Sequence, residues 1–371
     1  MKNKIFEVYF DCGLSKIRAS VFNKDSSKNN LYYESNFFFD HSHLEAEIQK
    51  IISLIEKDNK EYLDEINLMI DSPKMLSVGI SISKKLDGSK LQKKDIQFLI
   101  QDVKQQVLRN YSEQNIIHII VKSYKIDGRA YTYLPDGMDC KLISLDILFI
   151  CMPKEIIEYY KKIFFNSDIS VNQILCTSYA KSESYKGNFS LIENLSFIDI
   201  GFNKTSITCY IKNQIFFLDI LPVGGNHVTK DISKVLKIGL QDAEKIKISF
   251  DKDRDFLDKQ KISPNLIQQV IFARIEEILE LSAKSIKLNL NLTALEQCKM
   301  ILTGEGSKLL SNKFKEKISI SYDIDLLDET VEDIFQLASK IAYGSNKQEV
   351  VTVPKKLKKQ GFFEKLFHFF L

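Results

Sequence analysis

A short pattern that occurs twice constrains the fold of this 371-residue chain more than any other feature. An apolar run that ends in an acid and a glycine covers 197–201, and after a short turn a second apolar run covers Ile207–Ile211. About 190 residues earlier, a run that ends in Asp11-Cys12-Gly13 turns in the same way into an alternating run. Each copy predicts a strand, a tight turn and a returning strand. An acid at the end of a strand can anchor hydrated Mg²⁺.

A glycine pair follows the second copy. A third predicted strand leads into Gly224-Gly225, and apolar residues then recur at the spacing of one buried helix face, with Asn226 as the expected cap. A shorter predicted helix carries Glu244 and Lys247 three positions apart on one side. Backbone N–H groups at the start of a helix, together with its partial positive charge, suit a phosphate. This stretch therefore predicts a nucleotide site.

A further glycine turn lies near the C-terminal end. The apolar run Cys298–Leu302 predicts a strand, and Thr303-Gly304-Glu305-Gly306 follows it. Such a loop indicates a close approach of the backbone to a ligand, although a plain turn from strand to helix is the alternative.

Bulk properties exclude several classes of protein. The composition, with 44% apolar and 27% charged residues, is typical of a globular protein, and a net charge of +3 argues against a nucleic-acid partner. The six cysteines include no C-x-x-C pair, which argues against zinc and disulfides, so we expect most to be buried thiols in a reducing cytoplasm. We find no signal peptide and no apolar run long enough to cross a membrane.

Residues 77–151 predict a separate module of strand, helix, strand and strand (βαββ). No cluster of residues in it suggests catalysis, so we expect an interaction surface.

The C-terminal end predicts a membrane anchor. Residues 344–360 lose periodicity and carry several lysines, which indicates a flexible basic linker, and 361–371 predict an amphipathic helix. Its lysine-rich approach favours anionic lipid, although docking on the protein's own core is the alternative. The predicted membrane-facing residues are Phe362, Phe363, Leu366, Phe367, Phe369, Phe370 and Leu371.

The segments Leu221–Ile232 and Asp242–Lys247 resemble the second-domain signature of FtsA, the actin-like family of bacterial division proteins that tethers FtsZ to the membrane. The resemblance covers nearly the whole chain in order. It implies an α/β fold of the actin, Hsp70 and sugar-kinase ATPase superfamily: two duplicated ribonuclease H-like domains with an inserted βαββ subdomain, called 1C.

The resemblance also implies the domain boundaries. The first domain (1A) would cover 1–76 and be completed by 152–192 and about 323–343, with subdomain 1C at 77–151. The second domain (2A/2B) would cover 193–322, with 2B at about 228–297, and the linker 344–360 and the amphipathic helix 361–371 would follow.

By the same resemblance, the site would bind ATP, with Asp11 and Asp199 holding Mg²⁺ through water molecules. The residues expected to approach the nucleotide are Asp11, Gly13, Ser15, Lys16, Asp199, Gly201, Thr205, Gly224, Gly225, Asn226, Glu244, Lys247, Gly304 and Gly306. No catalytic residue is assigned, and we expect ATP hydrolysis to be weak or absent.

The second hairpin departs from the family, which usually has Gly-Gly-Gly-Thr where this chain has Gly201-Phe202-Asn203-Lys204. Two glycines that would let backbone N–H groups reach phosphate are therefore lost.

The resemblance implies a protein on the cytoplasmic side of the cell inner membrane, peripheral and at the division site. Its expected partners are the FtsZ C-terminal tail, received by 2B, other copies of itself in a filament or dimer, other division proteins through 1C, and anionic inner-leaflet lipid. Two alternatives stay open: an actin-like scaffold of pilus or secretion assembly, and a sugar or acetate kinase of the same superfamily.

Overall fold

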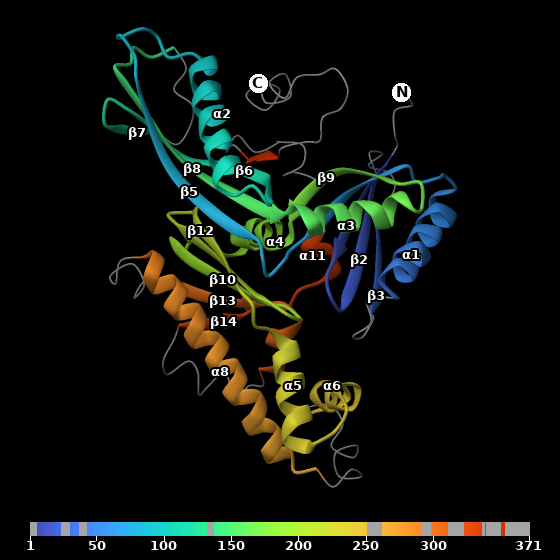
Figure 1. Cartoon of the computed structure of the whole chain (residues 1–371). Coiled ribbons are helices and arrows are strands. Elements are labelled where there is room, and N and C mark those ends of the chain that lie inside the picture. Colours follow the sequence, from blue (N-terminus) through green and yellow to red (C-terminus); the bar gives the residue numbers. More distant parts are fainter. Residues whose placement is uncertain are drawn as a thin grey trace.

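The computed structural model of the protein describes residues 6–23, 30–36, 43–131, 137–250, 262–290, 298–310, 323–335, 338 and 350–352. In this part of the chain the strands form three sheets, and helices pack against each of them (Figure 1).

The first sheet contains the first predicted hairpin. Its central strand pairs antiparallel with the returning strand and parallel with the next strand along the sheet. In spatial order its strands are β3 (Leu31–Asn36), β2 (Lys16–Asn23), β1 (Phe6–Cys12), β4 (Glu65–Ile70) and β9 (Ser170–Cys176). Its helices are α1 (Leu44–Asn59), α3 (Lys154–Phe165) and α4 (Thr177–Lys186), followed by the short helix η2 (Gly187–Phe189).

The second sheet repeats this arrangement. Its central strand again pairs antiparallel with the returning strand of a hairpin and parallel with the strand on its other side. In spatial order its strands are β12 (Gln214–Leu221), β11 (Thr205–Ile211), β10 (Asn194–Ile200), β13 (Lys299–Thr303) and β14 (Ile324–Leu326). Its helices are α5 (Gly225–Leu236), α6 (Leu240–Ser249), α8 (Pro264–Asn289) and the short η3 (Glu305–Leu309).

The two sheets therefore have one topology. When the strands of each sheet are numbered along the chain, their spatial order in both sheets is third, second, first, fourth, fifth. Corresponding neighbours also pair in the same direction, antiparallel or parallel. This confirms the predicted duplication. We call the first sheet with its helices the first lobe, and the second sheet with its helices the second lobe.

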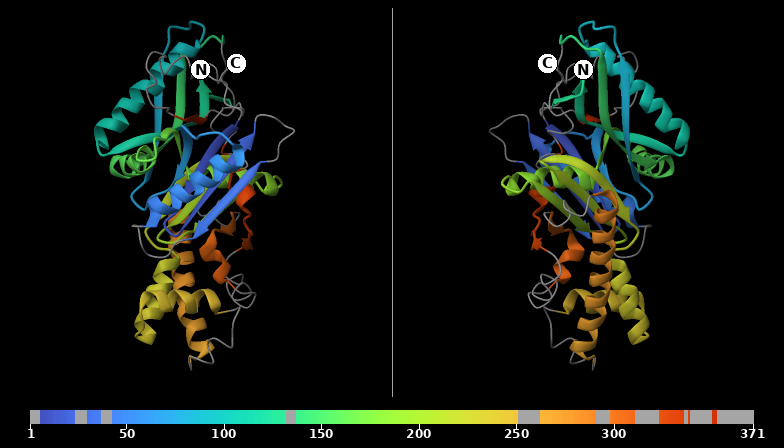
Figure 2. Two further views of the ribbon diagram at one scale, coloured as in Figure 1. Left: turned by 90° about the vertical axis from the view of Figure 1, so that its right-hand side faces the viewer. Right: turned by 90° about the vertical axis from the view of Figure 1, so that its left-hand side faces the viewer.

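The predicted βαββ module is confirmed as a third sheet. The inserted elements are β5 (Leu76–Lys85), α2 (Lys93–Asn110), β6 (Gln114–Ile126), β7 (Arg129–Tyr131) and β8 (Leu142–Pro153). This sheet lies at one end of the molecule, and α5, α6 and α8 lie at the other (Figures 1 and 2).

The segment predicted as a linker contains a strand, which corrects the expectation of an irregular segment throughout. Val350–Thr352 form β15, which pairs antiparallel with β6 at the edge of the inserted sheet. β-branched residues favour strands, and an edge strand offers unpaired backbone groups. Residues 361–371, with their predicted membrane-facing side chains, lie outside the described residues.

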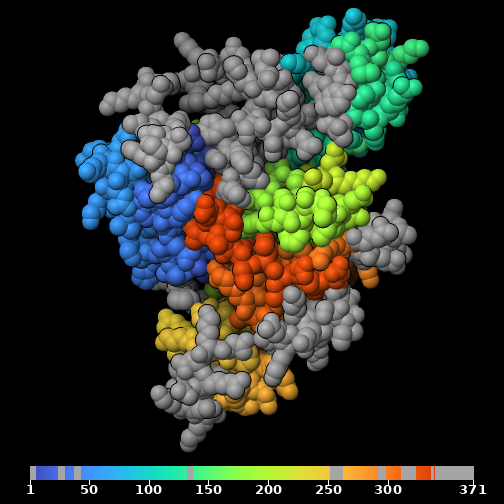
Figure 3. Space-filling view, turned by 180° about the vertical axis from the view of Figure 1, so that it is seen from behind, coloured from blue at the N-terminus to red at the C-terminus, as the bar shows by residue number. Residues whose placement is uncertain are grey.

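The two lobes share a core. Buried residues of the first lobe form one continuous apolar cluster with Phe197, Tyr210 and Leu218 of the second sheet. After β14 the chain returns to the first lobe, where α11 (Val331–Phe335) contacts α4, β2 and β3. Figure 3 shows this red segment lying against the blue first lobe. All six cysteines are buried and free, as expected.

Candidate functional site

Two cavities lie side by side between the lobes. The inner cavity, of ≈ 100 Å³, is bordered by both hairpins, and the outer cavity, of ≈ 220 Å³, by α6 and η3. Both are lined by Ser15, Lys16, Gly201, Phe202 and Glu305, so they form one cleft. The charged residues that line the inner cavity are Asp11, Lys16, Arg18, Asp71, Lys181, Asp199, Lys204, Glu305 and Glu329. The outer cavity is lined by Ser15, Lys16, Asn36, Gly201, Phe202, Gly225, Glu244, Lys247, Ile248, Phe250, Glu305, Gly306, Lys308 and Leu309.

The hairpins close in the same way in both lobes. Gly13 N–H donates to Lys16 O at 3.0 Å, and Gly201 N–H donates to Lys204 O at 2.9 Å. Each turn therefore ends in a lysine and places a strand-end aspartate beside the inner cavity. The duplication thus extends to the hydrogen bonds of the turns.

The backbone N–H groups at the glycine pair are hydrogen-bonded to the second hairpin. Gly225 N–H donates to Gly201 O at 2.9 Å, and Asn226 N–H donates to Phe202 O at 2.7 Å. A Cβ on Gly224 would lie 2.5 Å from Gly201 O, so the close approach of the second hairpin requires this glycine. The expectation that these N–H groups are free for phosphate is therefore wrong. Asn226 is also not the cap, because α5 begins at Gly225 with Gly224 before it.

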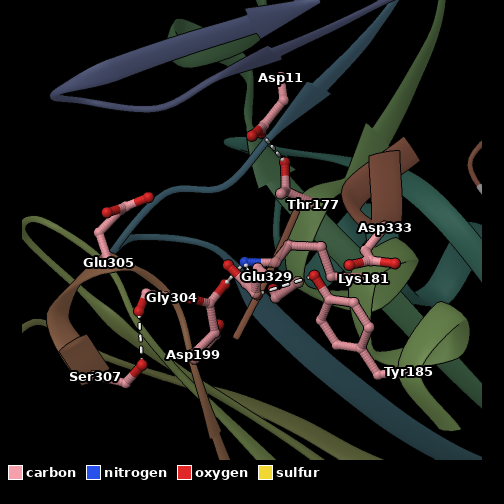
Figure 4. A network of polar contacts seen from close by, with 12 residues as sticks. Asp11, Thr177, Lys181, Tyr185, Asp199, Gly304, Glu305, Ser307, Glu329 and Asp333 are labelled. Carbon is pink, nitrogen blue, oxygen red and sulfur yellow. Dashed lines mark hydrogen bonds and ion pairs between the residues drawn. The ribbon is translucent and has the colours of Figure 1, made fainter. Parts of the chain in front are cut away.

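Asp11 is buried and has two partners within the first lobe. Thr177 Oγ1–H donates to Asp11 Oδ1 at 2.9 Å (Figure 4). Arg18 Nη1 lies 3.3 Å from Asp11 Oδ2. The antiparallel register of β1 and β2 pairs Asp11 with Arg18, which explains the contact. Burial raises the pKa of Asp11 above its ordinary value, although Arg18 and Lys181 act in the opposite direction.

Asp199 has an ammonium partner from the other lobe. Lys181 Nζ, on α4, lies 2.9 Å from Asp199 Oδ2 and 2.7 Å from Glu329 Oε1, and Tyr185 O–H donates to Glu329 Oε1 at 3.0 Å (Figure 4). Burial alone would raise the pKa of Asp199, but Lys181 and Lys204 outweigh it and hold that pKa below its ordinary value. Asp199 is therefore charged and neutralised by a side chain of the protein.

Further ion pairs join the lobes around the inner cavity. Lys204 Nζ of the second hairpin lies 2.7 Å from Asp71 Oδ2, which follows β4. Lys16 Nζ and Arg18 Nη2 of the first hairpin lie 3.1 and 3.0 Å from Glu305 Oε1 of η3. These contacts hold the two hairpins and η3 together across the cleft.

The outer cavity contains a buried pair on α6. Lys247 Nζ lies 2.6 Å from Glu244 Oε2 and also donates to Thr229 Oγ1 at 2.9 Å. Burial lowers the pKa of Lys247, although Glu244 opposes this effect. With apolar surface from Ile248 and Leu309 nearby, this cavity offers both polar and apolar contacts, as a nucleoside requires.

The structure brings most of the predicted residues to the cleft. Those that line a cavity are Asp11, Gly13, Ser15, Lys16, Asp199, Gly201, Gly225, Glu244, Lys247, Gly304 and Gly306. Thr205, Gly224 and Asn226 line neither cavity. Thr205 is fully buried and donates its hydroxyl hydrogen to Val223 O at 2.8 Å, so its role here is structural.

Sequence reasoning missed the charged residues Arg18, Asp71, Lys181 and Glu329. Arg18 could have been found, because the length of the predicted turn places it opposite Asp11. Lys181 carries no such signal, because α4 shows no clear apolar face.

The inner cavity does not fit the predicted magnesium ion. Asp11 and Asp199, the expected anchors, each have a cationic partner in the protein. Gly304, whose φ of 85° suits glycine, also packs so closely on Asp199 Oδ1 that a Cβ there would overlap it. Within the described ranges, no group of three or more His, Cys, Asp or Glu side chains is arranged to hold a metal ion.

Comparisons with known proteins agree with the fold and with the sequence resemblance. The family model described as "Cell division protein FtsA" matches residues 196–355. Over 359 residues the chain is 24% identical to the cell division protein FtsA of Buchnera aphidicola subsp. Acyrthosiphon pisum, covering 85% of both chains. It is 22% identical to that of Agrobacterium fabrum over 72% of this chain, which spans 63% of the relative.

Among solved structures, the fold is similar to one titled "PilM-PilN type IV pilus biogenesis complex", with a TM-score of 0.58 at 11% identity, covering 88% of this chain and 89% of that one. The structure of MreB5 of Spiroplasma citri bound to ADP matches with a TM-score of 0.47 at 12% identity, covering 92% and 97%. The chain is therefore a relative of the FtsA cell division proteins, and it has an actin-like ATPase fold.

Proposed function

We propose that this chain is a division scaffold that binds ATP between its lobes, attaches to the inner face of the cytoplasmic membrane through its C-terminal residues, and recruits FtsZ. One observation carries the nucleotide part: two lobes of identical topology place their hairpins on either side of a continuous cleft. The actin-like ATPase fold generally binds a nucleotide with a divalent metal. The outer cavity would receive the nucleoside, and the hairpins would lie beside the phosphates.

A lysine on α6 gives the sharpest test of the nucleotide site. Lys247 lines the outer cavity, whereas Lys245, on the same helix, is exposed and pairs with Asp242. We expect Lys247→Met to weaken ATP binding about tenfold, equivalent to ~1.4 kcal/mol, and Lys245→Met to leave it unchanged. Isothermal titration calorimetry with each purified variant measures both. Equal affinities for the two variants would place the nucleotide elsewhere.

Hydrolysis would be slow. Each carboxylate that lines the inner cavity has a cationic partner. The pairs are Asp11 with Arg18, Asp71 with Lys204, Asp199 with Lys181, Glu329 with Lys181, and Glu305 with Lys16. A general base must be free to accept a proton from water, and in the described part of the cleft no carboxylate is. The same observation disfavours a small-molecule kinase.

Membrane attachment would come from residues 361–371. Among the described helices, none combines the length and the apolar run that crossing a bilayer requires. A short amphipathic helix binds lipid weakly and reversibly, so several copies joined in a filament would hold more firmly than one. ATP-dependent self-association would in this way control attachment.

Flotation with vesicles of phosphatidylglycerol and phosphatidylethanolamine tests the anchor. We expect Phe362→Glu, and a chain that ends at Gly344, to remain at the bottom of the gradient. Glu364→Gln, a change on the polar side of the same predicted helix, should float like the unaltered protein. Undiminished flotation of Phe362→Glu would refute the anchor.

FtsZ recruitment would use the second lobe, where α5 and α8 pack together at the far end of the molecule (Figure 1). We expect the protein to co-sediment with FtsZ polymers and to lose this when FtsZ lacks its C-terminal tail. Co-sedimentation that persists without the tail would contradict this part of the proposal. The match to the pilus complex, at 11% identity, shows the fold alone, whereas the relatives matched by sequence are division proteins.

A further inference from the structure

We propose that the Lys181 ammonium takes the place of the divalent cation that actin-like ATPases generally use, so that this cleft closes and binds nucleotide without a metal ion. The nucleotide half of this inference rests on the proposed function. The half that concerns metal ions rests on the inner cavity alone.

Lys181 is placed between carboxylates from two other segments. It lies on α4 of the first lobe, Asp199 lies at the end of β10 in the second lobe, and Glu329 lies between β14 and α11. The three side chains are 6%, 13% and 5% exposed, so the ammonium fills the space between the two acids. A cation of the first lobe that joins two carboxylates from other segments performs the structural task of a bridging metal ion.

A metal ion beside Asp199 would have to displace this ammonium. Lys181 Nζ is already at hydrogen-bond distance from Asp199 Oδ2, and Gly304 packs against Asp199 Oδ1, so each oxygen has a close neighbour in the protein. A divalent ion near this aspartate would lie within a few ångströms of the ammonium, where repulsion between like charges is strong because the site is buried.

The ammonium also makes a metal ion unnecessary. A metal at the end of β10 would offset the repulsion between the Asp199 carboxylate and the phosphates of a nucleotide. Here Lys181 neutralises Asp199, and Lys204 and Arg18 add two further cations to the lining of the inner cavity. Burial alone would lower the pKa of Lys181, but Asp199 and Glu329 outweigh it and raise that pKa well above its ordinary value, so the cation persists at neutral pH.

Removing the ammonium should create a metal site. Lys181→Met leaves Asp199 and Glu329 buried without their cation, a pair that a divalent ion can then bridge. We expect excess Mg²⁺ to raise the melting temperature of Lys181→Met relative to EDTA, and one Mn²⁺ ion per chain to bind, as measured by electron paramagnetic resonance. The unaltered protein should show neither effect. Lys186→Met, the same change on the same helix but in a lysine paired with Glu183, should behave like the unaltered protein.

The test of the metal site does not depend on one variant being soluble. Lys181→Gln supplies a second neutral variant should Lys181→Met be insoluble, and the Mn²⁺ titration of the unaltered protein needs no variant. One Mn²⁺ ion bound by the unaltered protein and lost in Asp199→Asn would overturn the inference. The absence of any metal effect on the neutral variants would also overturn it.

Nucleotide binding is then measured on the unaltered full-length chain in EDTA and in Mg²⁺. We expect the two ATP affinities to agree within about threefold. Binding that weakens tenfold or more in EDTA would overturn the inference and leave the proposed nucleotide site standing. No binding under either condition would instead overturn the proposed nucleotide site, and the Mn²⁺ titration would still decide the metal half.

Discussion

The ion pair between Lys204 and Asp71 should be one of the main contacts that hold the lobes together. The Lys204 Nζ to Asp71 Oδ2 distance is 2.7 Å, and the side chains are only 13% and 5% exposed. Removing one member of a buried pair leaves an uncompensated charge and costs about 3–5 kcal/mol. We therefore expect Lys204→Met to lower the free energy of unfolding by that amount.

A second ion pair of the same length, but exposed to water, serves as the control. Lys74 Nζ also lies 2.7 Å from a carboxylate, Glu155 Oε1, but these side chains are 71% and 61% exposed. Exposed pairs contribute roughly 0–1 kcal/mol, because water screens them. Lys74→Met should therefore change stability by less than about 1 kcal/mol, which isolates burial as the cause of the difference.

A double-mutant cycle separates the pair from its surroundings. Asp71 also accepts the Ser178 N–H hydrogen bond at 3.1 Å, so Asp71→Asn alone has a cost of its own. We expect urea unfolding of Lys204→Met, Asp71→Asn and the double variant to give a coupling energy of about 2–3 kcal/mol. A coupling below about 0.5 kcal/mol would refute the reasoning that this pair holds the lobes together.

Three further outcomes follow from single residues. Burial raises the pKa of Glu329 although Lys181 opposes this effect, so the folded state keeps the Glu329 proton to a higher pH than the unfolded state does, and stability should rise as pH falls toward the ordinary pKa of a glutamate; Glu329→Gln should flatten that dependence in urea titrations. Thr205→Val should lose about 1–2 kcal/mol of stability through the unsatisfied Val223 carbonyl, with ATP affinity measured by calorimetry unchanged. Gly304→Ala should cost at least about 2 kcal/mol in thermal unfolding, because φ is 85° and a Cβ overlaps Asp199.

The helices and strands whose apolar residues recur at a regular spacing could be predicted from the sequence. The two hairpins, the βαββ module and the apolar face of α1 are each encoded in a run of neighbouring residues, and the structure contains all of them. The duplication of the two sheets could also be predicted, because the hairpin pattern occurs twice, whereas the order of all five strands comes from the structure.

The contacts at the cleft could not be predicted in the same way. A sequence shows that a glycine is required, but it does not show what approaches it: at Gly224 the neighbour is the second hairpin and not a phosphate. Lys181 is buried although α4 has no clear apolar face, because its partners Asp199 and Glu329 come from other segments. The strand β15 depends on an open edge of β6, which only the folded sheet provides.

Photolabelling with 8-azido-ATP, followed by mapping of the labelled peptides, tests most directly whether the two lobes enclose a nucleotide. The structure predicts label in peptides that line the outer cavity, at 244–250 or 304–309, and protection of these peptides by excess ATP. Label confined to other parts of the chain, or label that excess ATP does not reduce, would contradict a nucleotide site between the lobes.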